Sequence, residues 1–392
     1  MAILIRGGDV YAPEALGPKD ILIAGGRIEA VAESGTIALR GADLREIDAA
    51  GRRVLPGLLD SHVHILGGGG EGGPATRAPE IGIEDIAAAG VTTLVGCLGT
   101  DGLTRSMSAL LAKARALEIE GVSTFLFTGS YEVPVRTITG SVRSDLVLIE
   151  KVIGAGEIAI SDHRSSQPTF DEIARLAAEC RVGGLLGGKA GVLHLHLGDG
   201  GRGLQYLVRL MKETEIPPSQ VMPTHVNRNR RLLEEGIAYV LAGGYADFTV
   251  GTAVEEESDA DVSVETAVRL ALERGAPLER LTVTSDANGS KPVFDAGGSL
   301  VGLTIADERD LLEKLRSLVR RGILGLADAA RLFATNPARF YKLTGKGEIR
   351  PGFDADLILM DADLGLTDVV AKGRLLMEGG TLRARGTFAK RA

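Results

Sequence analysis

The stretch PGLLDSHVHI at residues 56–65 is a short apolar run that ends in two histidines. Side chains alternate along a β-strand, so His62 and His64 point to the same side of the strand. Two imidazoles one pleat apart can chelate a single metal ion. A His-x-His pair alone is a weak signal, and its meaning depends on the rest of the chain.

Seven further apolar runs come after this one, and segments of helical periodicity separate them. The runs begin at steps of roughly 25–35 residues, the length of one strand–helix unit. Strands that are apolar along their whole length belong to a parallel sheet covered by helices. Eight such units predict an α/β protein with a (β/α)8 TIM barrel, and a doubly wound open sheet is the second-ranked fold. The runs cover residues 57–65, 91–99, 122–131, 157–163, 192–199, 220–227, 245–252 and 281–288.

The two ends of the chain have a different pattern. Short strand-like segments separated by Gly and Pro turns fill the first 55 residues, and similar segments follow residue 345. Neither end carries enough apolar residues for a core of its own. The sequence therefore predicts a small β-sandwich domain built from residues 1–55 plus 345–392, with residues 56–344 forming the barrel.

The composition of the chain excludes several classes of function. Of its 392 residues, 44% are hydrophobic and 24% are charged, which is typical of a folded protein rather than a disordered one. The formal net charge of −8 argues against a nucleic-acid partner. We find no apolar stretch of the ~20 residues that a membrane span needs and no secretory signal pattern, so we expect a cytoplasmic protein. Cys97 and Cys180 are expected in the core, and a disulfide between them is an open alternative.

The histidines lie where a barrel enzyme would need them. All six fall at or near the C-terminal end of a predicted strand, the end that carries the active site of a β/α barrel. Two carboxylates fall at the same end of the barrel. Six ligands are too many for one tetrahedral catalytic zinc ion, but they suit two divalent ions bridged by a carboxylate and a hydroxide. The candidate ligands are His62, His64, Glu157, His196, His225 and Asp286.

This pattern, with a β domain built from both ends, resembles the amidohydrolase superfamily of metal-dependent hydrolases. The residues that carry the resemblance are PGLLDSHVH at 56–64, the later histidines and Asp286, and GKGEIRPGFDADLILMD at 345–361. More narrowly, the chain resembles the isoaspartyl (β-aspartyl) dipeptidases. The motifs of this narrower likeness lie between residues 56 and 295, and they are HVHILGGGGEGGPATRAPE, GSYEVPVRTITGSV, ISDHRS, GGLLGGK, PTHVNRN and SDANGS.

The resemblance implies a metallopeptidase that hydrolyses β-aspartyl dipeptides through a metal-bridging hydroxide. Its cofactors would be two divalent ions, and Zn2+ fits the predicted ligands best. In this scheme His62 and His64 bind one ion together with Asp286, whereas His196 and His225 bind the other.

The same resemblance implies roles for residues around the ions. Asp286 would act as general base and then as general acid. Tyr131, in GSYEVP, would donate a hydrogen bond to the oxyanion, and Glu71, in the glycine-rich loop, would receive the α-ammonium group of the substrate. The residues expected to hold the substrate carboxylates, or to touch the same end of the substrate, are Arg164, Arg228, Ser290 and Thr100.

One position departs from the family pattern. In the best-known relatives the bridging group is a carboxylated lysine on the fourth strand, and here Glu157 takes that place. The nearest lysine, Lys151, is expected in the preceding helix. Both groups present a monoanionic carboxylate, so we predict that Glu157 bridges the ions and that activity does not need bicarbonate. A site with one tightly and one weakly bound ion is the alternative.

Two histidines have no ligand role in this scheme. His194 is expected to be a hydrogen-bonded core residue, because the family pattern gives it no function. His163 precedes Arg164 and is expected to support the ligands from behind. The resemblance also implies a homo-oligomer, an octamer of paired subunits.

Two other kinds of function stay open. A cyclic amidase, a D-amino-acid deacylase or a deaminase would keep the metal centre of the superfamily and change the substrate. Glu71 together with Arg164 and Arg228 favours a zwitterionic dicarboxylate over a ring or an acyl chain. A non-enzymatic assembly protein of the same fold would usually have lost metal ligands, which this chain retains.

Overall fold

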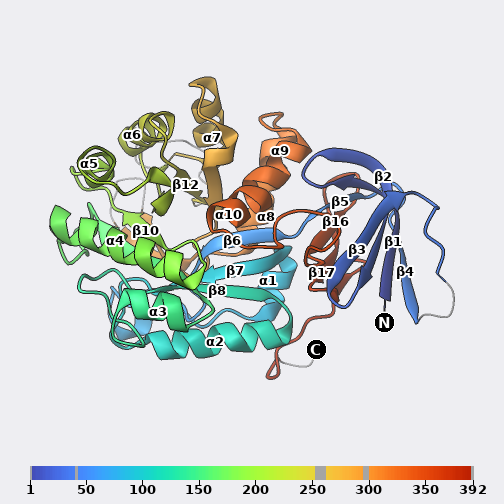
Figure 1. The fold of residues 1–392 in the computed structure, drawn as a ribbon, viewed down its shortest axis with the longest axis horizontal. Helices are drawn as coiled ribbons and strands as arrows, with labels where there is room; N and C mark the ends of the chain where they lie inside the picture. The colour runs from blue at the N-terminus through green and yellow to red at the C-terminus, as the bar shows by residue number, and fades with distance from the viewer. Residues whose placement is uncertain (1, 40–42, 252–261, 295–299, 390–392) are drawn as a thin grey trace.

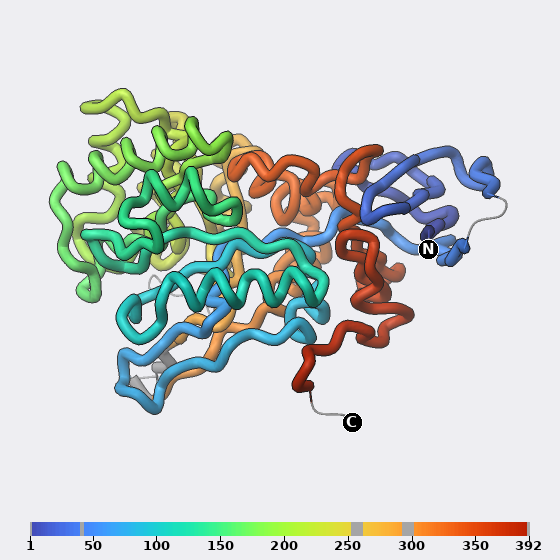
Figure 2. Tube along the Cα trace, turned by 60° about the horizontal axis from the view of Figure 1, so that its bottom comes forward, coloured from blue at the N-terminus to red at the C-terminus, as the bar shows by residue number. Residues whose placement is uncertain are grey.

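The computed structural model describes residues 2–39, 43–251, 262–294 and 300–389. A barrel and a separate β domain lie side by side in it, and Figures 1 and 2 show both from two directions. The blue N-terminal strands and the red C-terminal strands meet on one side of the molecule (Figure 1). The predicted architecture, a barrel with a β domain from both ends, is therefore confirmed.

Eight parallel strands form the barrel, as the spacing of the apolar runs predicts. Six of them make one sheet in chain order, and the last two form a pair. Backbone hydrogen bonds close the ring on both sides of that pair: Val226 N donates to Asp247 O (3.2 Å), and His64 N donates to Ala287 O (2.9 Å). The strands are β6 Leu58–Val63, β7 Val91–Gly96, β8 Ser123–Thr128, β9 Val152–Ile160, β10 Val192–Leu197, β11 Val221–Thr224, β12 Ala246–Thr249 and β13 Leu281–Thr284.

The fourth barrel strand is longer than the sequence predicts. Strand β9 begins at Val152, upstream of the expected start at residue 157, so Glu157 lies within the strand. Gly154 and Gly156 interrupt the β-favouring pattern of this segment, which explains why its first half is hard to recognise. The last residue of the seventh predicted run, Thr252, lies outside the described residues.

Helices surround the barrel strands (Figure 1). The longest of them, α4, is preceded by a capping box: the Thr169 side chain accepts a hydrogen bond from Glu172 N, and the Glu172 side chain accepts one from Thr169 N. Gly188, which follows the helix, adopts the left-handed conformation (φ 65°) that often ends a helix. The helices are α1 Ile83–Ala88, α2 Met107–Glu120, α3 Val142–Leu148, α4 Phe170–Gly187, α5 Gln205–Glu213, α6 Arg230–Leu241, α7 Val264–Glu273, α8 Arg309–Arg320, α9 Leu326–Ala330 and α10 Asn336–Phe340.

An antiparallel hairpin comes after the last barrel strand, and no sequence pattern predicts it. Its strands are β14 Ser290–Phe294 and β15 Leu300–Ile305. Ser290, one of the predicted substrate residues, is the first residue of β14. Long connections of this kind at the active end of a barrel often serve function.

The β domain joins both ends of the chain in one sheet of nine strands. The link is the antiparallel pairing of β5 with β16. Strands β4 and β5 both pair with one edge of β1, β4 with its first half and β5 with its second half. The sheet therefore splits at this edge, and the β domain encloses an apolar core of its own. The strands are β1 Ala2–Tyr11, β2 Ala15–Ala24, β3 Arg27–Glu33, β4 Leu44–Asp48, β5 Arg53–Pro56, β16 Leu357–Met360, β17 Leu366–Ala371, β18 Arg374–Glu378 and β19 Thr381–Leu382.

Burial follows the same division of the molecule. Every residue of β6, β7 and β10 is buried, because the barrel interior covers one face of each strand and the helices cover the other. Among the helices of the described residues, none has the length and apolar character needed to cross a bilayer.

Candidate metal centre

The C-terminal ends of five barrel strands bring the six predicted ligands together. His62 lies in β6 and His64 directly after it, while Glu157 lies in β9 and His196 in β10. Of the remaining two, His225 comes directly after β11, and Asp286 lies two residues after the end of β13. The predicted strand positions therefore put these side chains at one end of one barrel.

The backbone at the ends of β11 and β13 is unusual. His225 (φ 61°) and Asp286 (φ 56°) both adopt the left-handed conformation, which non-glycine residues rarely occupy. Asp60 ties this region to β6, because its two carboxylate oxygens accept hydrogen bonds from His62 N and Ser285 N (3.0 Å each). Such strain at functional residues persists only where the surrounding structure enforces it.

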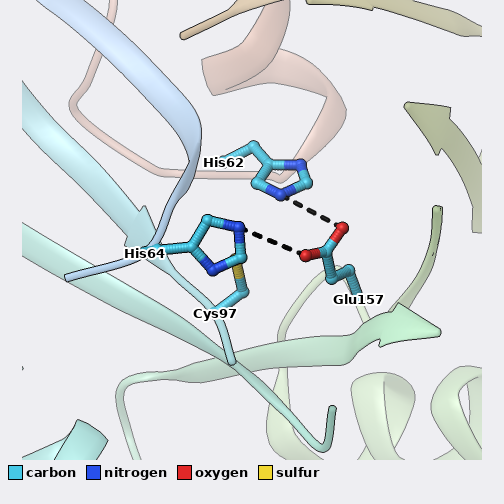
Figure 3. A group of neighbouring side chains, drawn as sticks. All are labelled: His62, His64, Cys97 and Glu157. Carbon is cyan, nitrogen blue, oxygen red and sulfur yellow. Dashed lines mark hydrogen bonds and ion pairs between the residues drawn. The ribbon is translucent and has the colours of Figure 1, made fainter. Parts of the chain in front are cut away.

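Glu157 is the centre of the site, and Figure 3 shows two imidazoles turned toward its carboxylate. We name the two sides after their histidines: the His62 half contains His62 and His64, and the His196 half contains His196 and His225. The distances to Glu157 are 3.2 Å from His62 Nε2 to Oε2, 3.3 Å from His64 Nε2 to Oε1, 2.9 Å from His196 Nδ1 to Oε2 and 3.8 Å from His225 Nε2 to Oε2.

Asp286 belongs to the His62 half. Its Oδ1 lies 3.0 Å from His64 Nε2 and 3.6 Å from His62 Nε2. The Asp286 side chain is 18% exposed, whereas that of Glu157 is 1% exposed, so Asp286 faces the opening of the barrel.

The donor set fits divalent cations. Within the described residues, three buried atoms of the site lack a hydrogen-bond partner, namely His62 Nε2, Glu157 Oε1 and Asp286 Oδ1. Unpaired buried polar atoms are costly, and a cation at their centre would satisfy all three. Two groups have ligand atoms within 4.8 Å of one another, and they share Glu157: His62, His64, Cys97 and Glu157 in one, and Glu157, His196 and His225 in the other.

The charges of the site favour the ligand forms of Glu157 and His225. For His62 and His64, burial opposes protonation but the neighbouring Cys97 and Glu157 raise the pKa well above its usual value, so these two rings must lose a proton to bind a metal. Burial opposes ionisation of Glu157, but His62 and His196 hold the pKa of its carboxyl well below the usual range. Burial lowers the pKa of His225 to about 3, so this ring is neutral. Metal binding requires ionised carboxylates and neutral imidazoles, and these two residues meet that requirement.

Each ligand histidine uses its second ring nitrogen for a supporting contact. In the His62 half, His62 Nδ1 lies 3.0 Å from His194 Nε2, and His64 Nδ1 lies 3.9 Å from Cys97 Sγ. Nδ1 of His194 in turn lies 3.1 Å from the Tyr341 hydroxyl. The expectation of a hydrogen-bonded core histidine at 194 is confirmed, and its partner is a candidate ligand.

The His196 half has different supports. His196 Nε2 lies 3.0 Å from Asp162 Oδ2, and His225 Nδ1 lies 2.7 Å from Thr249 Oγ1. Asp162 also accepts two hydrogen bonds from the Arg164 guanidinium (3.0 and 2.7 Å). Although burial alone would raise it, His196 and Arg164 keep the pKa of Asp162 well below its usual range. Such outer partners fix the orientation and basicity of a ligand.

Tyr131 lies next to the His196 half. It is 5% exposed, and its hydroxyl is 2.9 Å from His196 Nδ1. The Arg164 guanidinium lies 5.4 Å from the centre of the Tyr131 ring. Burial raises the pKa of Tyr131 well above its usual value, so the hydroxyl stays protonated and can donate a hydrogen bond.

The structure gathers three of the other predicted substrate residues around Glu71. Thr100 Oγ1 donates to its carboxylate (2.8 Å), Ser290 Oγ donates to it (3.3 Å), and Arg164 Nη1 lies 3.6 Å away. Arg228 is half-buried and donates from Nε to Leu197 O at the end of β10 (2.9 Å).

The loop that carries Glu71 is held by a buried arginine that was not predicted from the sequence. Arg105 is 5% exposed and donates to the backbone carbonyls of Leu66 (3.2 Å), Gly68 (2.9 Å) and Gly69 (3.3 Å). The sequence signal for this contact is weak, because a single arginine before a helix usually lies at the surface.

Two expectations from the sequence need correction. Lys151 lies in the turn before β9 rather than in a helix, and it contacts Glu118 and Thr124 at the end of the strand away from the ligands. His163 is exposed, and its neighbours Asp162 and Arg164 make the supporting contacts instead. The expectation of two buried core cysteines is confirmed: Cys97 and Cys180 are both free and buried, and Cys97 lies beside His64.

Known proteins are similar to this chain in sequence and in fold. Residues 53–376 match the model of the amidohydrolase family. The chain is similar to the crystal structure of β-aspartyl dipeptidase from Fervidobacterium islandicum AW-1 in complex with the β-Asp-Leu dipeptide, with 44% identity, coverage of 99% of each chain and a TM-score of 0.92. A dihydroorotase of Pelotomaculum thermopropionicum is 26% identical over 100% of this chain and 95% of its own length. Dihydropyrimidinase from Brevibacillus agri shares the fold (TM-score 0.69, 18% identity, full coverage of both chains).

Proposed function

The chain belongs to the amidohydrolase family of hydrolases, and we propose that it hydrolyses β-aspartyl dipeptides with two divalent metal ions, most simply Zn2+. One observation carries this proposal: two hydroxyls and an arginine gather around the Glu71 carboxylate, next to a cluster of buried ligands. The likeness to a β-aspartyl dipeptidase over 99% of both chains supports the same substrate.

Glu157 would be shared by both ions. It takes part in both ligand groups, and its two oxygens face different histidines of the His62 half. Asp286 would complete the His62 half, because its Oδ1 is 3.0 Å from His64 Nε2. Bound divalent ions polarise a carbonyl and lower the pKa of water to near neutrality.

Asp286 would move the proton during hydrolysis. His64 holds its carboxylate, and His64 and His62 keep the pKa of Asp286 below its usual value although burial opposes this. The ionised carboxylate would take a proton from the attacking water and later deliver it to the leaving amine. Its partial exposure toward the barrel opening fits a residue that meets both water and substrate.

Tyr131 would stabilise the oxyanion that forms on the scissile carbonyl. The protonated hydroxyl can donate a hydrogen bond to developing negative charge, and its burial strengthens that interaction. Asp162 and His196 position this region, since His196 contacts both the tyrosine and the aspartate.

Recognition of the substrate would rest on opposite charges at fixed places. Glu71, oriented by Thr100 and Ser290, would bind the α-ammonium group. Arg164 and Arg228 would bind carboxylates, because a planar guanidinium matches two oxygens. An α-linked dipeptide places its amine or its carboxylate elsewhere, so it would not satisfy both contacts.

The test compares three substrates with zinc-loaded protein and no added bicarbonate. We expect hydrolysis of β-Asp-Leu and none of α-Asp-Leu. Dihydroorotate is the third substrate, because a dihydroorotase is a full-length relative. Hydrolysis of the ring alone would refute the proposal, and a requirement for bicarbonate would refute the bridging role of Glu157.

A matched pair of variants tests the recognition step. Glu71→Gln removes the charge that binds the ammonium group, and we expect KM to rise ~10–100-fold because a charge-assisted hydrogen bond is lost. Glu80→Gln is the control, since Glu80 is exposed and pairs with Lys113. Equal KM values for both variants would remove Glu71 from the substrate site.

Assembly and location are proposals as well. The homo-oligomer implied by the dipeptidase resemblance agrees with exposed leucines on neighbouring helices: Leu148 of α3 (69% exposed), and Leu185 (65%) and Leu186 (68%) of α4. Light scattering of the purified protein would give the subunit number. We also propose a cytoplasmic protein, which cell fractionation would test.

A further inference from the structure

Cys97 contacts His64 but has no role in the hydrolysis proposed above. It directly follows β7, on the strand next to β6, and it is 1% exposed. Figure 3 shows its sulfur beside the His64 ring. The two polar contacts of the thiol are long, 3.9 Å from Sγ to His64 Nδ1 and 3.7 Å from Sγ to Val63 O.

The neighbours of this thiol lack partners. Cys97 belongs to a group whose ligand atoms lie within 4.8 Å of one another, together with His62, His64 and Glu157. In that group His62 Nε2 and Glu157 Oε1 are buried without a hydrogen-bond partner in the described part of the chain. The sulfur therefore adjoins donors that face a common centre and are not satisfied by the protein.

We propose that Cys97 is a protein ligand of the ion in the His62 half. This inference rests on the proposed two-ion centre and adds a thiolate to it. With Asp286, the donor set would then be two imidazole nitrogens, two carboxylates and one sulfur, a combination suited to zinc and softer ions. The thiol proton leaves to solvent when the ion binds.

The distances agree with such a site. Bonds of ~2.0–2.3 Å to one ion place neighbouring donor atoms roughly 3–3.7 Å apart. The imidazole–carboxylate distances of the His62 half, 3.2 and 3.3 Å, match this value. The sulfur lies within 4.8 Å of the other ligand atoms of the group, so it would have to move closer when the ion binds.

With the thiolate, the two halves would differ further in the number of protein ligands that they offer an ion. With Cys97 and Asp286 the His62 half would offer five protein donors, whereas the second group offers three, Glu157, His196 and His225. Zinc sites with four protein ligands are closed, and sites with three keep a position for water or substrate. Tyr131 and Arg164 both lie by His196, the side that would remain open. Cys97 would thus strengthen the binding of the ion in the His62 half, which has more protein donors than the His196 half.

Cobalt(II) distinguishes a ligand from a hydrogen-bonded thiol. A thiolate bound to cobalt produces a charge-transfer band in the near ultraviolet, and a thiol hydrogen-bonded to His64 does not. We expect the band in the wild type after the first equivalent of cobalt and its loss in Cys97→Ser. Cys180→Ser is the matched control, because Cys180 is buried in α4 and burial raises its pKa to about 12.

The metal affinity gives a second readout. Zinc binding to Cys97→Ser, measured by competition with a chelating dye, should be at least ~10-fold weaker for the first ion, with the second ion less affected. A wild-type protein that shows the visible cobalt bands without the charge-transfer band overturns the proposal, and this result does not depend on whether the variant folds. Dipeptide hydrolysis is scored separately, so an inactive protein that shows the band would refute only the proposed function.

Discussion

The two halves of the metal centre share one carboxylate, but the protein supports them differently. His62 contacts the ring of His194, which is neutral because burial lowers the pKa of His194 well below its usual value. His196 contacts the ionised carboxylate of Asp162, which also accepts a hydrogen bond from Arg164. A carboxylate behind an imidazole increases the basicity of the ligand and couples it to the charge around it.

The surroundings of the two halves also differ, both in burial and in their contacts with the predicted substrate residues. His62 is fully buried, and its support continues inward to His194 and Tyr341. The His196 half adjoins Tyr131 and Arg164, and through Arg164 it reaches Glu71. One half is built to hold an ion in a fixed place, and the other connects an ion site to the groups that would bind substrate.

The largest effect should come from the residue that both halves share. Glu157→Gln keeps the shape of the side chain and removes its charge, so both ion sites lose a ligand. We expect both ions to be lost and kcat/KM to fall by at least ~10³-fold. Metal analysis after gel filtration and dipeptide hydrolysis check this.

Glu265→Gln is the control for that experiment, because Glu265 is a buried glutamate in α7 that pairs with Lys314, outside the metal centre. If Glu157→Gln retained one ion at full occupancy, the two halves would be independent sites, and the idea of a shared carboxylate would be wrong.

A smaller effect should separate chemistry from ion binding. Tyr131→Phe removes the hydroxyl beside His196 and leaves the ligands in place. We expect kcat to fall by ~10²–10³-fold, the usual range for one oxyanion donor, while the metal content stays at the wild-type level. Steady-state kinetics with β-Asp-Leu and metal analysis measure both quantities. Loss of an ion in this variant would instead make Tyr131 a support of His196.

The barrel could be predicted from the sequence because its signals are local. A strand buried on both faces must be apolar along its length, and the units repeat at a nearly constant step. The ligands at strand ends follow from the same rule, and the structure does bring His62, Glu157 and His225 together. The hairpin β14–β15 was not predicted because it lies within a strand–helix connection and breaks that repeat.

The supports of the ligands could not be predicted in the same way. Each contact joins residues from different strands, such as Asp162 after β9 with His196 in β10, or Thr249 in β12 with His225 after β11. Aspartate and threonine are common at strand ends, so their type carries no signal. Cys97 was placed in the core correctly, but only the packing of β7 against β6 brings it to His64.

The third prediction tests the support that distinguishes the His196 half. Asp162→Asn keeps hydrogen-bonding atoms and removes the negative charge that His196 and Arg164 share. We expect the affinity of the His196 half for its ion, the second ion to bind, to fall ~10–100-fold, as for other outer partners of ligands. We also expect KM to rise, because Arg164 loses the carboxylate that holds it in place. Metal titrations and steady-state kinetics measure the two quantities. Tyr341→Phe, behind His194, is the comparison in the His62 half and should change neither quantity. Equal effects of both variants would mean that the halves do not differ.

The smallest effect should come from the neutral support of His225. Thr249→Val keeps the shape of the side chain but removes the hydroxyl 2.7 Å from His225 Nδ1. A hydrogen bond between neutral groups contributes about 0.5–1.5 kcal/mol, so affinity for the second ion should fall only ~2–10-fold. Thr249→Ser restores the hydroxyl and should behave as the wild type in metal titrations. His225 and His196 belong to the same half, so the two variants compare two kinds of support for one ion. Thr249→Val measures the contribution of a neutral partner to metal affinity, and Asp162→Asn measures that of a charged partner. If Thr249→Val weakened metal binding as much as Asp162→Asn, the supporting residues would act by orienting the imidazole rings and not by their charge. The two halves would then differ only in their contacts with the groups proposed to bind substrate.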